Sequence, residues 1–193
     1  MDSTPTPPRL APPGAGLPRV ELFIARQLFR WHRLKTSRDA AAAQIETERA
    51  TIVTLARGCD PAAAARPVLI PRLRGLEDSS RNWSVYMTVE HVRIVNASIT
   101  GLLQLLPAGR IPPRAASTAT VKPPAGIDGT VIAAFERGCT ELAAAAAAIP
   151  DLHAGARYAH PWFGPLDAAG WHAMAGFHLE LHRRQIEEII ARL

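Results

Sequence analysis

Apolar positions recur along most of this chain with the three-to-four-residue spacing of helices. The first such region, residues 20–57, contains no proline or glycine and ends at Gly58. One straight helix of that length would span about 57 Å at 1.5 Å per residue. We therefore expect a break near the sequence KTSRD, with Ser37 capping the helix that follows.

Three further helices are predicted, each limited by a candidate cap or by a helix breaker. The first comprises residues 82–106. The second comprises residues 129–149, which include an alanine run and stop before Pro150. The third comprises the C-terminal residues 169–193. The candidate N-terminal caps of these helices are Asn82 or Ser84, Asp128 or Thr130, and Asp167.

The stretches between these helices are rich in proline and are predicted to be loops. They cover residues 59–81, 107–126 and 151–167, and none shows the alternation that is typical of strands. Residues 1–19 are also rich in proline, and we expect them to be disordered or extended. The prediction is a single domain over residues 20–193: an all-α four-helix bundle with an N-terminal helical or extended extension.

Three histidines fall within the apolar stripes of two of these helices. At about 100° per residue, His178 and His182 lie in the middle of the stripe of the last helix, and Glu180 lies opposite. In the second helix, His91 lies among apolar positions in the same way. The positions that define the two stripes are Trp171, Met174, Ala175, Ile186, Ile189 and Leu193 in the last helix, and Met87, Ile94, Val95, Leu102 and Leu105 in the second. We expect all three imidazoles to point into the core.

A buried imidazole needs a partner, because burying an unpaired polar group costs free energy. A lone core histidine is usually a hydrogen-bonded core residue, but three that converge from facing helices, with no obvious buried carboxylate, favour a shared metal. Imidazole is a common ligand of zinc, nickel, iron and copper. Three protein ligands leave a coordination position open, as in catalytic sites. Glu180 and Glu90 point away from the stripes, which excludes the arrangement of HExxH zinc proteases.

Three more residues are candidates for the wall of a pocket beside the histidines: His160, Trp83 and Trp162. His160 lies in a loop that leads directly into the last helix. The alternative is that the following segment, residues 161–163, only plugs the end of the bundle, and we favour this over ligation by His160. The remaining histidines, expected in loops or on helix surfaces, are His32, His153 and His172.

Composition narrows the function classes further. The 193 residues carry 22 lysines and arginines against 17 acidic residues, a formal charge of +5, but the arginines are scattered and nucleic-acid binding is not expected. No window offers the roughly 18 apolar residues of a membrane span, so no membrane partner is expected. Cys59 and Cys139 form no CxxC pair, and we expect small buried residues rather than nucleophiles. Two distant cysteines suit a reducing compartment, and the N-terminus shows no signal-peptide pattern, so we expect a cytoplasmic location.

The segments NWSVYMTVEH, HPWFGPLDAAGW and FHLELHRRQI together resemble the DinB/YfiT-like superfamily, over roughly residues 38–193. The resemblance implies a four-helix bundle with a divalent metal, often nickel or zinc, held by three histidines. Matched by position, these are His91, His178 and His182. It also implies a homodimer and, for some members, a hydrolase or transferase that uses a low-molecular-weight thiol such as bacillithiol or mycothiol.

The leading hypothesis is a metal-dependent thiol S-transferase or hydrolase that acts on a small electrophile. The metal's open position would receive a thiol or water and lower its pKa. No general base can be identified in the sequence. The alternative is a non-enzymatic protein that uses the same bundle to bind a small apolar ligand or a protein partner.

Overall fold

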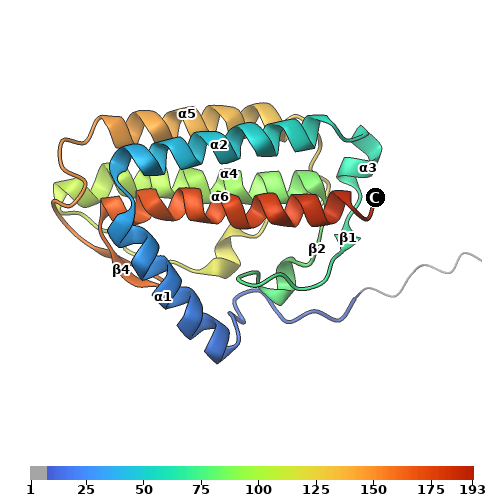
Figure 1. The fold of residues 1–193 in the computed structure, drawn as a ribbon, viewed down its shortest axis with the longest axis horizontal. Helices are drawn as coiled ribbons and strands as arrows, with labels where there is room; N and C mark the ends of the chain where they lie inside the picture. Colours follow the sequence, from blue (N-terminus) through green and yellow to red (C-terminus); the bar gives the residue numbers. More distant parts are fainter. Residues whose placement is uncertain (1–7) are drawn as a thin grey trace, which may run out of the picture.

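Four helices form the body of the protein in the computed structural model, which describes residues 8–193. They are α2 (Arg38–Arg57), α4 (Val85–Leu105), α5 (Val131–Ala147) and α6 (Ala168–Ile190). Helices α2 and α5 lie in one layer and α4 and α6 in the other (Figure 1). Helix α4 packs against α5 and α6, and α2 packs against α6. The predicted all-α four-helix bundle is confirmed.

The helices begin where their capping residues predict. The side chains of Ser37, Ser84 and Asp167 each accept a hydrogen bond from a backbone N–H three residues later, at 3.2, 3.0 and 2.8 Å. The predicted break therefore lies between α1 (Arg19–Lys35) and α2. Ahead of α5, Asp128 accepts the backbone N–H of Thr130 at 2.9 Å, so both candidate residues take part in that helix start.

The connections between the helices hold more structure than predicted. The short elements in them are α3 (Pro61–Ala65), β1 (Val68–Leu69), η1 (Asp78–Ser80), β2 (Asn82–Trp83), η2 (Leu106–Ala108), η3 (Thr118–Val121), β3 (Tyr158–His160) and β4 (Gly164–Leu166). Strand β1 pairs antiparallel with β2, and β3 pairs antiparallel with β4. The expectation of no strands is thus wrong, because strands of two or three residues are too short to show an alternating pattern.

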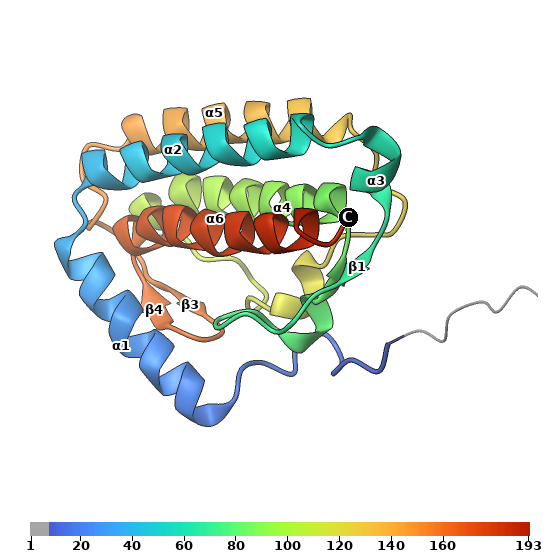
Figure 2. The same cartoon turned by 45° about the vertical axis from the view of Figure 1, so that its right-hand side comes forward.

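An N-terminal strap, residues 11–16, lies against the loop before α4. The backbone N–H of Ala11 donates to Asp78 at 2.7 Å, and those of Gly14 and Gly16 donate to Glu77 at 3.5 and 3.3 Å. Residues 1–7 of the segment predicted to be disordered or extended lie outside the described residues. After the strap, α1 runs obliquely along one end of the bundle (Figures 1 and 2).

One apolar core runs through the bundle and includes most of the positions expected in the two stripes. The exceptions in α4 are Met87, Ile94 and Leu105, which are only partly buried and lie outside this core. In the last helix the exception is Leu193, which lies beyond the end of α6 and is exposed. His172 is the opposite case. It was expected on the surface but is 1% exposed, because the α1–α2 junction and the loop after α5 cover that side of α6. Within residues 8–193, no helix combines the length and the apolar character needed to cross a bilayer.

Candidate metal centre

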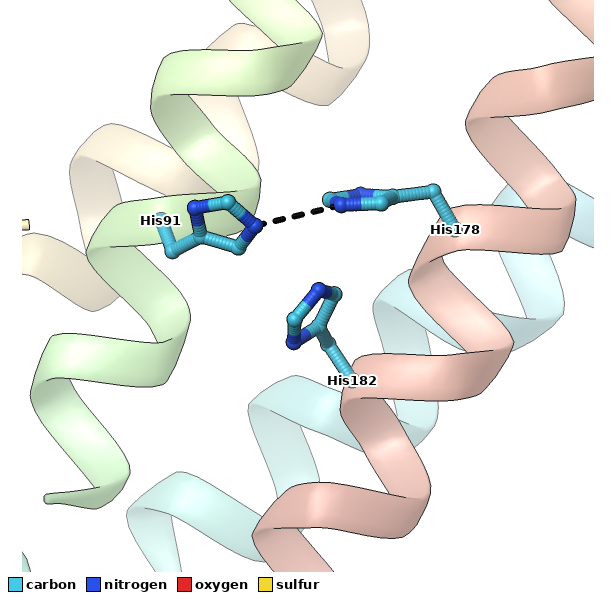
Figure 3. A group of neighbouring side chains, drawn as sticks. All are labelled: His91, His178 and His182. Carbon is cyan, nitrogen blue, oxygen red and sulfur yellow. Dashed lines mark hydrogen bonds between the residues drawn. The ribbon is translucent and has the colours of Figure 1, made fainter. Parts of the chain in front are cut away.

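The three histidines of the apolar stripes meet between α4 and α6. His91 projects from α4, and His178 and His182 project from successive turns of α6 toward it (Figure 3). The ring centroid of His182 lies 4.5 Å from that of His91 and 4.4 Å from that of His178. His91 and His182 are buried, whereas His178 keeps partial exposure. The three histidines that the sequence pattern selected therefore lie together in the fold.

Hydrogen bonds fix the orientation of two of these rings. Nδ1 of His91 lies 2.7 Å from the carbonyl oxygen of Val121, so it donates its proton there and leaves Nε2 unprotonated. Nδ1 of His182 lies 2.7 Å from Oε1 of Gln185, whose Nε2 donates to the carbonyl oxygen of Ser80 at 2.8 Å. Such outer contacts hold metal-ligating imidazoles in one tautomer and orientation.

All three imidazoles are held in the neutral form. Burial lowers the pKa of His91 to about 4, against a smaller opposing effect of the Val121 carbonyl. Burial, followed by repulsion from the neighbouring imidazoles, holds the pKa of His178 and of His182 well below the usual range. A neutral imidazole carries the lone pair that a metal needs, so the cluster is in its ligand form at neutral pH.

The spacing of the nitrogens suits a transition metal. One nitrogen of each ring can be chosen so that all three lie within 4.8 Å of one another. Nε2 of His91 and Nε2 of His178 are 3.2 Å apart. Tetrahedral bonds of 2.0–2.1 Å place two ligand nitrogens roughly 3.3 Å apart. Nδ1 of His178 is buried and has no hydrogen-bond partner among the described residues. The residues present therefore fit a metal held by three imidazoles.

A cavity of about 450 Å³ opens on this cluster, and all three histidines line it. Its further walls are mostly apolar and include Val95, Ile99, Leu102, Trp171 and Met174. A cavity of this size accepts a small organic molecule beside the imidazoles. The site therefore has both a set of ligands and room for a reactant.

Of the three residues predicted to line a pocket, two line this cavity and one does not. His160 and Trp162 lie in the cavity wall, where Nδ1 of His160 accepts the backbone N–H of Trp162 at 3.1 Å. His160 is not part of the cluster of candidate ligands found among residues 8–193. Trp83 does not line the cavity. Its ring packs behind the cluster, with its centroid 5.0 Å from that of His91 and 6.2 Å from that of His182.

A buried carboxylate that the sequence analysis missed lies in the same wall. Glu77 is 3% exposed and binds Nζ of Lys122 at 2.7 Å and Oγ1 of Thr118 at 2.8 Å, in addition to the strap. Burial raises the pKa of Glu77, but the hydrogen bonds from Lys122 and Thr118 outweigh that effect, and the pKa is lowered overall. Glu77 lies in a loop without periodicity, so the sequence offers only its nearness along the chain to the second helix as a reason to place it at the site.

The two glutamates beside the histidines are engaged elsewhere. Glu180 forms an ion pair with Arg184, and Glu90 forms one with Arg93, with 2.6 Å between Oε2 and Nε. Neither belongs to the histidine cluster. The prediction that these carboxylates point away from the site is confirmed, and with it the exclusion of an HExxH-type arrangement.

Neither cysteine has the environment of a reactive thiol. Cys139 is buried, and burial raises the pKa of its thiol to about 12. Cys59 is partly exposed, and burial raises its thiol pKa as well. A nucleophilic cysteine requires a lowered pKa and access to solvent. The expected burial therefore holds for Cys139 and not for Cys59.

Comparison with known proteins agrees with this architecture. The model of the DinB superfamily matches residues 44–186. The crystal structure of TT2238, described as a four-helix bundle protein, is 24% identical with a TM-score of 0.58; the similarity covers 78% of this chain and 98% of that one. No curated protein matches the sequence. Because the family model covers well over half of the chain and includes all three clustered histidines, the protein belongs to the DinB superfamily.

Proposed function

We propose that this protein binds a divalent transition metal, nickel or zinc, through His91, His178 and His182. One observation carries the proposal: three neutral imidazoles converge within 4.8 Å at the base of a cavity. Val121 and Gln185 engage Nδ1 of His91 and of His182, which leaves Nε2 of each ring as the candidate ligand atom. This is the arrangement of a catalytic rather than a structural site, since three protein ligands leave a coordination position open.

We further propose that the protein is a thiol S-transferase or hydrolase that acts on a small electrophile. A divalent metal in this site would supply Lewis acidity and lower the pKa of a thiol or a water molecule, which then serves as the nucleophile. The apolar wall formed by Val95, Ile99 and Met174 would hold the carbon skeleton of the electrophile and exclude bulk water. In this proposal a thiol nucleophile is a low-molecular-weight thiol, because neither Cys59 nor Cys139 lines the cavity.

The second candidate is a protein that binds a small apolar ligand without turnover. It is favoured by the apolar walls and by the engagement of Glu180 and Glu90 in ion pairs, which leaves no carboxylate of either helix at the histidine cluster as a general base. The two candidates share the cavity and differ only in what happens to the occupant.

Metal content tests the first part of the proposal. The wild-type protein, purified without chelators or metal-affinity steps, should contain about one transition-metal ion per chain. The His182→Ala variant should lose most of it, whereas the matched variant His160→Ala, in the cavity wall, should retain it. Unchanged metal content in a variant that lacks all three clustered histidines would refute the site.

Turnover tests the second part. We expect the metal-loaded protein to conjugate or hydrolyse members of a panel of small electrophiles when offered a panel of low-molecular-weight thiols, and His178→Ala to abolish this. Tight capture of an apolar probe without any metal-dependent turnover would instead favour the binding protein.

A further inference from the structure

Helix α1 exposes a largely apolar face to solvent, in which Gln27 is the one polar residue between the helix ends. Six of its large hydrophobic side chains are more than half exposed, and they are Val20, Phe23, Ile24, Leu28, Trp31 and Leu34. Only three other large hydrophobic residues of the described chain are exposed to a comparable degree, and they lie in separate segments. At about 100° per residue, the six fall on one side of the helix. A contiguous apolar face of this kind marks an interaction site.

The bundle does not need this face. The opposite side of α1 makes the contacts with the core: Phe29 is buried, and its ring centroid lies 4.5 Å from that of Phe163 and 5.5 Å from that of Phe177. Helix α1 also precedes residue 44, where the match to the family begins. In Figure 2 the helix forms the outer edge of the molecule, so a flat surface could meet its outer face along the whole length.

The charge of α1 indicates what covers the face. The helix carries five basic residues and one acidic residue, Glu21, which is already paired with Arg72. Arg19, Arg26 and Arg30 fall together along one edge of the apolar face. In an antiparallel pair of α1 helices related by a two-fold axis, these basic edges would lie side by side and repel each other. The charge therefore disfavours an antiparallel second copy and favours an anionic surface.

We propose that α1 binds the surface of anionic phospholipid bilayers, with its apolar face among the acyl chains and its basic residues at the headgroups. An exposed apolar face that includes Trp31, flanked by arginines, is the pattern of helices that lie in the membrane interface. Lys35 lies 4.3 Å over the ring of Trp31 and completes the basic rim at the C-terminal end of the helix. The sequence argument against a membrane partner concerned spanning segments, which such a helix does not require.

This binding would hold the cavity close to the bilayer. Nε of Arg26 donates to the carbonyl oxygen of Trp162 at 2.6 Å, and Trp162 lies in the cavity wall. Helix α1 is thus attached directly to the β3–β4 hairpin that leads into α6. A protein docked through α1 would meet apolar small molecules that concentrate in the membrane.

Vesicle flotation with the full-length protein tests the proposal. We expect the wild type to float with vesicles of phosphatidylcholine and phosphatidylserine, and to bind vesicles of phosphatidylcholine alone at least tenfold more weakly. The Ile24→Glu/Trp31→Glu variant should lose binding about a hundredfold. The matched control Leu69→Glu, which places the same charge at an exposed apolar residue of β1, should bind like the wild type.

The electrostatic part is tested by Arg19→Gln and Arg30→Gln, each of which should weaken binding to the anionic vesicles about fivefold. Helix content and thermal midpoint, measured for every variant, show that the fold is retained. Absence of wild-type binding to anionic vesicles, or equal binding by Ile24→Glu/Trp31→Glu, would overturn the proposal. So would a stable dimer, seen by light scattering, that the same double substitution dissociates, because the face would then be covered by a second copy.

Discussion

Replacing Glu77 with glutamine should destabilise the protein, because this buried carboxylate has a cationic partner and several hydrogen-bond donors. The substitution keeps the volume of the side chain but removes the negative charge from a residue that is 3% exposed. Nζ of Lys122, at 2.7 Å, would lose its counter-ion while its side chain remains only 16% exposed. The strap would lose the charged acceptor for its two glycine N–H groups.

The size of the effect follows from these contacts. Removing one partner of a buried ion pair costs about 3–5 kcal/mol, because the remaining charge is left unpaired. Lys122 can regain part of its hydration, so we expect a loss of about 3 kcal/mol in the free energy of unfolding at neutral pH. Because the pKa of Glu77 is lowered in the fold, its stabilising effect is complete above the ordinary carboxyl pKa. It is lost as the pH falls through the lowered value.

Urea unfolding monitored by circular dichroism measures this effect. The difference between wild type and Glu77→Gln should shrink as the pH is lowered, since both proteins then carry a neutral side chain at position 77. The double variant Glu77→Gln/Lys122→Met should be more stable than Glu77→Gln alone, because it removes the unpaired charge as well. A loss below about 1 kcal/mol for the single variant, or a difference that does not depend on pH, would refute the reasoning.

Three further predictions concern other parts of the fold. Gly155→Ala should lower the free energy of unfolding by roughly 2–4 kcal/mol, because residue 155 has a φ of +84° and a Cβ there would lie 2.0 Å from a backbone carbonyl oxygen. Gly164→Ala, at a φ of +73° but in open space, should lower it by only about 1 kcal/mol in the same assay. In the native protein a thiol reagent should label Cys59 faster than Cys139, whose thiol pKa is about 12, and equal rates would show that Cys139 is accessible. Burial, and then the charge of Arg38, lower the pKa of His172. As the pH falls, the unfolded chain therefore binds a proton at this residue before the native protein does, and stability decreases below about pH 6.5. Unfolding of the metal-free protein at several pH values should show that His172→Leu reduces this slope, and an unchanged slope would contradict the assignment.

The histidine cluster could be predicted from the sequence because its residues repeat with the period of a helix. His178 and His182 are one turn apart on the apolar side of α6, and His91 has the same kind of position on α4. Packing of two amphipathic helices must bring such positions together. Gln185, which binds His182, was detectable on the same grounds, since it lies three residues further along the same face.

The remainder of the site comes from loops and left no periodic signal. The carbonyl of Val121 is a backbone group in η3, and any residue type could have supplied it. Glu77 and Lys122 lie in two different proline-rich loops, and only the folded chain shows that they form a buried pair. His172 was misplaced for a related reason: a helix contacted on several sides buries positions that a two-faced wheel assigns to solvent.

The strap has a practical consequence for choosing the boundaries of a shorter fragment of this protein. The family match begins at residue 44, but Gly14 and Gly16 already hold Glu77, and through it Lys122, in the cavity wall. A fragment that started at the family boundary would keep all three candidate ligands, yet it would lack the first turn of α2 and the donors that position this wall. In this chain, the unit defined by sequence similarity is therefore smaller than the unit that shapes the cavity beside the histidines.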